Sequence, residues 1–129
     1  MGKESRARVL KDHQAMAVAR NIRVSPRKLN LVAQAIRGKR VERALNELSF
    51  SPKRIAKDVK KILQSAIANA ENRNNDVDVD KLMVTECYVN EGPRMKRVRP
   101  APMGRAYRYQ RRMAHIVVKV GDGVKEEAK

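Results

Sequence analysis

The sequence predicts an α+β fold in which one strand, three helices and a long β-hairpin follow one another along the chain. Apolar residues recur at helical spacing through the middle of the chain, between about residues 26 and 72. β-branched residues are frequent before and after this region, where they favour strands. Prolines and glycines lie between the last two predicted strands, where a hairpin would turn.

The chain length suits a single domain. At 129 residues, the chain can bury one modest hydrophobic core but not two. Residues 1–14 are polar and charged without a sustained period, so we expect a flexible basic tail there. Residues 15–129 would form the α+β domain, with an extended hairpin at about residues 82–120.

The first predicted strand spans Ala15–Val24. Its alternating pattern places Val18, Ile22 and Val24 on one face, while Asn21 points to the other.

Two helices are expected after this strand. Ser25-Pro26 opens the first one, because serine is a good N-cap and proline at the first helical position loses no hydrogen bond. Gly38 supplies its C-terminal stop. A short second helix is predicted over Val41–Leu48. The apolar positions of the two helices are Leu29, Val32, Ala33 and Ile36, then Ala44, Leu45 and Leu48.

The third helix has the clearest pattern in the chain. Ser51-Pro52 repeats the opening signal, and Asn72–Asp76 would end the helix. Its apolar stripe follows helical spacing for about five turns and consists of Ile55, Val59, Ile62, Leu63, Ala66, Ile67 and Ala70.

Two strands are predicted near the C-terminus, over Leu82–Asn90 and Arg111–Val120. The residues between them include Pro93, Pro100, Pro102 and Gly104. A loop of this length without structure is uncommon in a compact domain, so a long hairpin that leaves the domain and turns near Pro-Ala-Pro is the simpler interpretation.

The charge indicates a polyanionic partner. The chain has 30 Lys and Arg against 14 Asp and Glu, a net charge of +16, which suits RNA, DNA or an anionic membrane. A membrane span is not expected, because the longest strictly apolar run, Ala15–Ala19, is far below the roughly 20 residues required. The charged N-terminal sequence resembles no signal peptide, and a single cysteine cannot form an internal disulfide, so we expect a cytoplasmic protein.

Gly92–Gly121 is a basic segment of thirty residues. With 30 basic and 14 acidic residues in 129, an even distribution would place about seven and about three there, whereas the segment has nine and none. A solvated charged face is the ordinary explanation of such a run. However, an isolated two-stranded hairpin is only marginally stable in water and charge repulsion would weaken it further, so a neutralising partner is the better explanation.

RNA recognised by its shape and phosphates is the predicted partner. Arginine predominates in the basic segment and binds phosphates in a bidentate manner. With no Trp, one Phe and three Tyr, the chain lacks the aromatic platform of base-stacking modules, and it shows no zinc-finger or bZIP spacing. The candidate RNA-binding residues are Arg20, Arg23, Arg27, Lys28, Lys39 and Arg40 around the first helix, and Arg94, Lys96, Arg97, Arg99, Arg105, Arg108, Arg111 and Arg112 in the basic segment.

No catalytic site, cofactor or metal is expected. His115 falls in a predicted strand, where a structural role is the ordinary one, and Cys87 has no nearby His–Asp pairing. Asp76, Asp78 and Asp80 alternate as in a calcium loop, but the glycine and the distal glutamate of such a loop are missing.

Three stretches carry a family resemblance. SPRKLNLVAQAIRGKRVERALNELSFSP, KKILQSAIANAENRN and LMVTECYVNEGPRMKRVRPAPMGRA closely resemble the bacterial large-subunit ribosomal protein twenty-two family. The resemblance covers about residues 15–120. Its most specific parts are SAIANAE, Ser65–Glu71, and EGP-x-MKR, Glu91–Arg97.

The resemblance implies three helices packed on a small three-stranded antiparallel sheet, with a long protruding β-hairpin. Members of the family bind large-subunit ribosomal RNA early in assembly. Their domain lies on the outside of the subunit beside neighbouring ribosomal proteins, as a monomer, and the hairpin reaches the nascent-peptide exit tunnel, where changes confer macrolide resistance. Carried over to this chain, the tunnel-side residues are Arg94, Met95, Lys96, Arg97, Val98, Arg99, Pro100, Ala101, Pro102, Met103, Gly104 and Arg105.

This sequence departs from the family pattern at two places. Arg94 replaces the usual small residue before MKR, and Pro102-Met103-Gly104 replaces a more basic turn. Two other functions stay open on the residues alone. A free-standing nucleic-acid-binding or DNA-compacting protein would need comparable affinity for duplex DNA and a dimer interface. A small enzyme acting on RNA would need a catalytic carboxylate. The sequence nominates none of these features.

Overall fold

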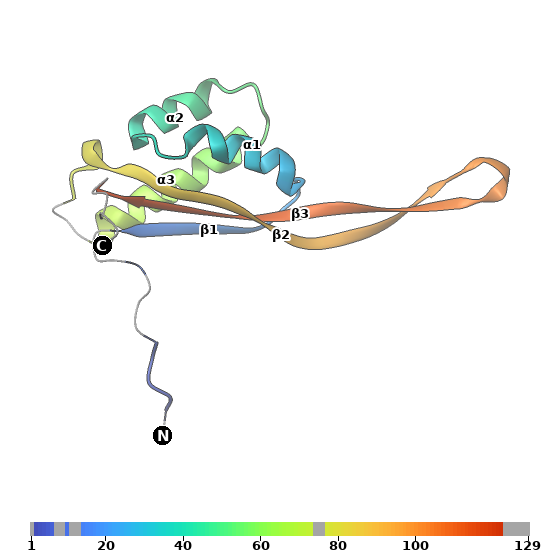
Figure 1. Cartoon of the computed structure of the whole chain (residues 1–129), viewed down its shortest axis with the longest axis horizontal. Coiled ribbons are helices and arrows are strands. Elements are labelled where there is room, and N and C mark those ends of the chain that lie inside the picture. Colours follow the sequence, from blue (N-terminus) through green and yellow to red (C-terminus); the bar gives the residue numbers. More distant parts are fainter. Residues whose placement is uncertain (1, 7–9, 11–13, 74–76, 123–129) are drawn as a thin grey trace, which may run out of the picture.

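The computed structural model describes residues 2–6, 10, 14–73 and 77–122 and has an α+β fold (Figure 1). The elements in chain order are β1 (Ala15–Ile22), α1 (Pro26–Ile36), α2 (Val41–Phe50), α3 (Ala56–Arg73), the 3₁₀ helix η1 (Val79–Lys81), β2 (Met83–Pro100), the 3₁₀ helix η2 (Pro102–Gly104) and β3 (Ala106–Gly121). The three helices, the antiparallel sheet and the long hairpin that the sequence predicts are therefore confirmed. The predicted tail and C-terminal residues lie partly outside the described residues.

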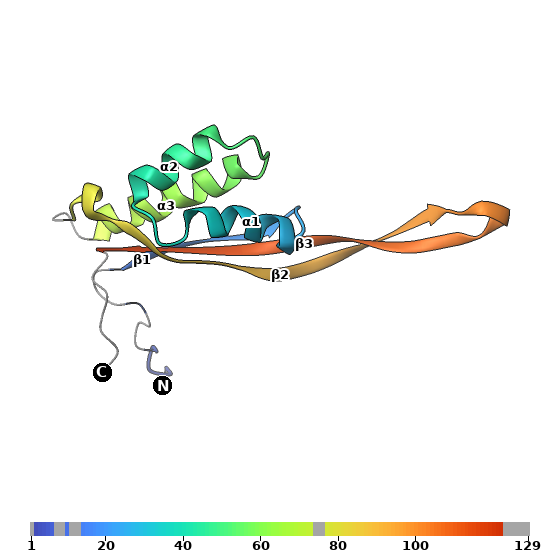
Figure 2. The same ribbon diagram turned by 45° about the horizontal axis from the view of Figure 1, so that its top comes forward.

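The sheet has the strand order β1-β3-β2, and all neighbours are antiparallel. The three helices lie on one side of it, as Figure 2 shows. α1 and α3 contact the sheet directly, whereas α2 packs mainly on α3. None of the described helices has the length and apolar character needed to cross a membrane.

The core fills the space between these helices and the sheet. The predicted apolar stripes of α1 and α3 are buried there, and β3 contributes Ile116, Val118 and Val120, each 0% exposed. The two ends of α1 are formed by the residues that the sequence predicts. Ser25 Oγ accepts a hydrogen bond from the Lys28 N–H at 3.5 Å, and Gly38 adopts the positive φ of 76° that ends the helix.

The predicted orientation of β1 is wrong in its first half. Ala15 and Ala17 face the core, whereas Val18 is 42% exposed on the opposite face. The register of β1 against β3 then shifts between Ala19 and Ile22, at a bulge where Asn21 has φ of 58°. The bulge turns Ile22 toward the core, so Val18 and Ile22 do not share a face. Small alanines suit the inner face because α3 packs along this strand.

The predicted start of α3 is also wrong. Ser51-Pro52 does not open the helix, which begins at Ala56. The Ala56 N–H donates to the Lys53 carbonyl at 3.1 Å, and this turn places Ile55 in the core before the helix begins. The predicted helix end, Asn72–Asp76, lies partly outside the described residues, since α3 is described to Arg73.

Candidate RNA-binding surface

Beyond the helices, β2 and β3 continue as a paired arm, which comprises Glu91–Met113 (Figure 1). Every residue of the arm is exposed or half-buried, and burial begins again at Ala114, which is 0% exposed. The predicted basic segment continued to Gly121, but Ala114–Gly121 belongs to the sheet of the globule. Ile116, Val118 and Val120 of this stretch are buried in the core beneath the helices, which explains the difference.

Charge repulsion opposes pairing along the arm. It contains eight basic residues and a single acid, Glu91, at its base. Arg94 lies directly opposite Arg112, and like charges in this position weaken an antiparallel pair. No residue of the arm is buried to offset this repulsion. The arm therefore lacks the apolar packing that holds the same two strands together inside the globule.

Strand register divides the arm into two faces. Residues that lie opposite each other on β2 and β3 project to the same side. One face, the tyrosine face, consists of Met95, Arg97, Arg99, Tyr107, Tyr109 and Arg111. The other, the lysine face, consists of Arg94, Lys96, Val98, Arg108, Gln110 and Arg112. Both faces are basic, but both tyrosines of the arm lie on the first, where the Arg111 guanidinium lies 5.7 Å from the Tyr109 ring centre.

A network of polar contacts holds the base of the arm. Arg94 donates hydrogen bonds to Glu91 Oε1, with its Nη2 at 2.6 Å and its Nε at 2.8 Å. Its Nη1 donates to Gln110 Oε1 on the opposite strand at 3.2 Å. Arg94 thus joins the two strands where the register shifts between Glu91 and Arg94. Its guanidinium is already engaged inside the protein, and that of Arg97 donates to the Lys96 carbonyl at 2.9 Å. The side chains of Arg99, Arg105 and Arg108, farther along the arm, have no polar partner in the described part of the chain.

Gly92 allows the strands to approach closely at this bulge. A Cβ atom added there would lie 3.1 Å from both the carbonyl carbon and the carbonyl oxygen of Met113, and 3.3 Å from the Ala114 nitrogen. These are backbone atoms, which cannot yield as a flexible side chain can. A side chain at position 92 would therefore push β2 away from β3 where the arm leaves the globule.

The turn at the tip lies where the prolines predict it. The Ala101 N–H donates to the Arg105 carbonyl at 2.8 Å and closes the turn around η2. Met103 and Gly104 have φ of 61° and 70°, and the Met103 side chain is 96% exposed. The twelve residues predicted for the tunnel side do not share one location. Arg94 lies at the base, Met95–Arg99 runs along the shaft, and only Pro100–Arg105 forms the tip.

Four predicted RNA-binding residues of the globule lie at the end from which the arm projects. Arg20, Arg23, Arg27 and Lys28 are exposed on β1, on the β1–α1 connection and in the first turn of α1. The pairing of Ile22 with Ala114 brings this connection next to the base of the arm. These four side chains and the arm therefore offer one basic surface at this end.

Lys39 and Arg40 lie at the opposite end of the sheet. Arg40 forms a bridge with Met83, the first residue of β2. The Lys39 ammonium is 2.6 Å from each carboxylate oxygen of Glu47, so its charge is balanced within the protein. The structure therefore separates these two residues from the other four.

Some basic residues that the sequence did not single out have clear positions. Arg37 holds α1 against β2, because its Nε donates to the Cys87 carbonyl at 2.8 Å and its Nη2 to Asn30 Oδ1 at 3.2 Å. Lys57 and Lys61 are exposed on the first half of α3. Their spacing of four residues places them side by side on the helix surface, outside the apolar stripe.

The other predicted sites have structural surroundings. His115 Nδ1 accepts a hydrogen bond from the Asn21 N–H at 3.1 Å and so supports the bulge in β1. Cys87 is buried, and burial raises the pKa of its thiol to about 11, although nearby Arg37 opposes part of the change. Among the described residues, no group of three His, Cys, Asp or Glu side chains could hold a metal ion; Asp76 lies outside them.

Comparisons with known proteins agree with this architecture. Residues 17–121 match the family model described as "Ribosomal protein L22p/L17e". A protein of Solibacter usitatus named "Large ribosomal subunit protein uL22" is 69% identical over 107 residues, which cover 83% of this chain and 95% of the relative. The protein of the same name from Rhizobium etli is 60% identical over 120 residues, which cover 93% and 92%. That of Ruegeria is 54% identical over 128 residues, which cover 99% and 100%.

The matched residues run from Ala17, the third residue of β1, to the end of β3 and include the complete arm. The chain therefore belongs to the ribosomal protein L22p/L17e family.

Proposed function

We propose that this protein is a structural component of the large ribosomal subunit, in the cytoplasm. It binds large-subunit ribosomal RNA, helps to assemble the subunit, and places its arm in the wall of the nascent-peptide exit tunnel. The observation that carries this proposal is the arm itself. Between Glu91 and Met113 the chain holds eight basic residues and none that is buried, so the arm is built to be covered by a partner of opposite charge.

Membership of the family supports the choice of partner. The relatives are named as proteins of the large ribosomal subunit, and their similarity extends over the arm as well as the globule. The arginines of the arm would grip phosphates in a bidentate manner and release counterions from the RNA. The four basic residues beside the arm would extend this contact to the globule.

The two faces of the arm would contribute differently. On the tyrosine face, Tyr107 and Tyr109 can stack on unpaired bases between arginines that contact phosphates. The lysine face has no aromatic side chain and would contact RNA by charge and shape alone. The tip, with Met103 almost fully exposed, is the part that can meet a nascent peptide.

A structural role, not a catalytic one, follows from this proposal. Each group that contributes does so through charge, shape or stacking, and no step requires a nucleophile or a proton transfer.

Sedimentation would test the proposal most simply. A strain whose only copy of the protein carries an affinity tag would be lysed and its ribosomes separated at moderate salt. We expect the protein with the large subunit in stoichiometric amounts. Recovery in the ribosome-free supernatant would contradict the proposal.

The tunnel placement needs a separate test. A photo-crosslinking residue at Met103 would be compared with one at Leu31, which is exposed on α1 in the globule. In ribosomes that carry a stalled nascent chain, the residue at position 103 should crosslink to the peptide, and the residue at position 31 should not. Equal labelling from both positions, or none from position 103, would refute the placement.

A further inference from the structure

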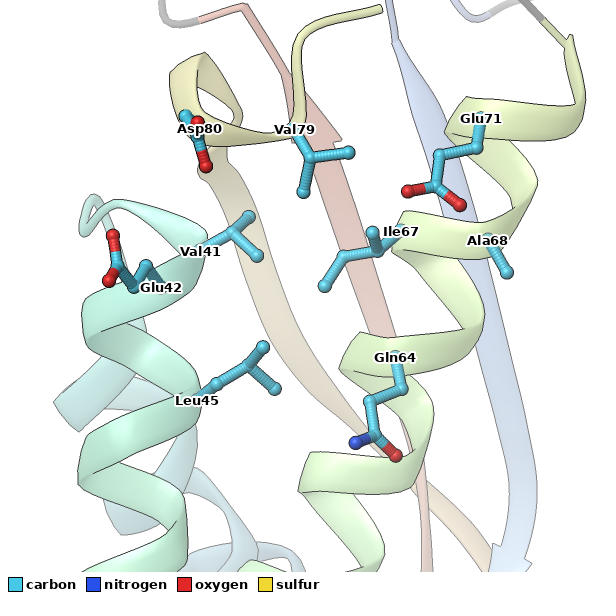
Figure 3. Close-up of a pocket in the computed structure, with 9 residues that line it drawn as sticks. All are labelled: Val41, Glu42, Leu45, Gln64, Ile67, Ala68, Glu71, Val79 and Asp80. Atoms are coloured by element: carbon cyan, nitrogen blue, oxygen red, sulfur yellow. The ribbon is translucent and has the colours of Figure 1, made fainter. Parts of the chain in front are cut away.

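A groove lies on the globule between α2, α3 and η1, at the end opposite the arm. Its volume is about 480 Å³. The apolar lining comprises Val41, Leu45, Ile67, Ala68 and Val79, with Gln64 at one end. Figure 3 shows Leu45 of α2 and Ile67 of α3 pointing toward one another across it.

Three carboxylates from three different elements surround this groove. Glu42 lies in the first turn of α2, Glu71 in the last turn of α3, and Asp80 in η1 (Figure 3). None of the three side chains has an ion-pair or hydrogen-bond partner within the part of the chain that the structure describes. By contrast, Glu47 and Glu86 are paired with lysines at 2.6 Å and 2.9 Å. In a chain of net charge +16, three acids that lack a partner among the described residues thus lie around one apolar groove.

The position of Glu71 adds an independent argument. A negative charge near the C-terminus of a helix is unfavourable, because the last carbonyl groups already carry partial negative charge. The Glu71 carboxylate is therefore in an unfavourable position in the free protein, whereas Arg73 in the same turn has the favourable sign. A cationic partner in the groove would remove this cost.

RNA does not fit such a surface. Its phosphates would be repelled by three carboxylates, and charge complementarity across an interface selects the opposite sign. Apolar side chains with a few polar groups at the edge are typical of a site that receives a short peptide segment. The partner that suits this groove thus combines apolar side chains with lysine or arginine.

We propose that the groove binds a short basic segment of a neighbouring protein in the assembled large subunit. Its apolar side chains enter between Leu45 and Ile67, and its lysines or arginines pair with the three carboxylates. The inference rests on the proposed function, since the partner is another protein of that particle. It assigns to this end of the globule a protein contact, while the arm and its base contact RNA.

Photo-crosslinking in purified subunits would test this proposal. Benzoylphenylalanine would replace Gln64, which lines the groove, or Ser65, the next residue on α3, which is exposed but does not line it. After irradiation and digestion of the RNA, mass spectrometry would identify the attached peptide. We expect position 64, but not position 65, to crosslink to one peptide that has lysine or arginine beside apolar residues.

A variant that lacks the three carboxylates gives the second part of the test. Neutralising the rim with Glu42→Gln, Glu71→Gln and Asp80→Asn should lower the crosslinking yield from position 64 roughly tenfold, because each exposed ion pair contributes a factor of about two. Asp58→Asn, which neutralises an exposed acid of α3 outside the groove, is the matched control and should leave the yield unchanged. The melting temperatures of the free variants would verify that both remain folded.

The outcomes separate the two proposals. A crosslink from position 64 to RNA, the absence of any crosslink, or an undiminished yield in the triple variant would overturn the groove assignment while the protein still sediments with the subunit. Failure to sediment with the subunit would overturn the proposed function and this inference together.

Discussion

The strands β2 and β3 have different surroundings in the globule and in the arm. Inside the globule, β2 and β3 are covered on one face by helices, and Val84 and Val118 are both 0% exposed. In the arm the strands remain paired, but Val98 is 65% exposed and arginines lie opposite one another. Hydrophobic burial holds the first half, whereas only strand pairing and a few polar contacts hold the second.

This difference shows how a long hairpin can be specified without a core of its own. Register is fixed where one face is buried, because a slip of one residue would turn every apolar side chain outward. The arm inherits the register from the globule through the bulge at Glu91–Arg94, where Arg94 links both strands. The side chains of the arm are therefore not needed to fix the register and can serve contact with a partner.

The largest effect is expected when arm charges are removed. Arg99, Arg105, Arg108 and Arg112 have no polar partner in the described part of the chain. Replacing all four with glutamine should weaken binding to large-subunit ribosomal RNA by about a thousandfold, at roughly 1 kcal/mol for each contact. The melting temperature of the free protein should stay unchanged. Filter binding would measure the RNA affinity and calorimetry the melting temperature. A large loss of stability with intact RNA binding would contradict the difference between arm and globule.

A matched pair of valine truncations compares the two regions directly. Val118→Ala should lower the free energy of unfolding by about 2 kcal/mol, because it leaves a cavity in the core. Val98→Ala, the same change in the arm, should alter it by less than about 0.5 kcal/mol. Chemical denaturation would give both values. Similar losses for the two variants would show that the arm shares in the core.

The raised pKa of Cys87 predicts that the free energy of unfolding of the globule depends on pH. Burial raises the pKa of the thiol from 9.0 to about 11 in the folded protein. Between these values the unfolded chain has lost the proton that the folded chain retains, so the free energy of unfolding falls as pH rises from 9 to 11. The contribution is about 2 kcal/mol. Compared with the parent, Cys87→Ala should flatten this dependence; an identical slope in the variant would contradict the account.

The smallest effect is expected at the base of the arm. Arg94→Gln breaks the link to Glu91 and Gln110, both of which are exposed, so the global stability should fall by less than about 1 kcal/mol. Amide exchange in the arm should nevertheless become faster. Arg112→Gln, on the opposite strand, removes the same charge without removing the link and should slow exchange or leave it unchanged. Equal effects of the two variants would argue against a special role for Arg94.

Elements with local signals could be predicted from the sequence. Ser25-Pro26 and Gly38 bound α1, and the stripe from Ile55 to Ala70 is buried as expected. The hairpin was also predictable, since Pro100 and Pro102 mark its turn. In each case a few adjacent residues, or one periodic pattern, contain the information.

Features that depend on contacts between distant residues could not be predicted. The bulge at Asn21 reverses the face of β1, and its partner His115 lies on β3, 94 residues away. Strand order and register arise from packing of the whole globule. The pairing of Lys39 with Glu47 balances a charge that composition counts as free, and the groove near Glu71 exists only once α2 and η1 meet α3.

Amide hydrogen exchange along β2 and β3 would test the central contrast most directly. In the free protein, amides of the paired strands near Cys87 and Val118 should be protected to nearly the global free energy of unfolding, whereas those from Met95 to Arg111 should exchange through local opening on a far shorter timescale. In intact large subunits, both regions should be protected. Equal, slow exchange of both regions in the free protein would show that the arm needs no partner and would contradict the account.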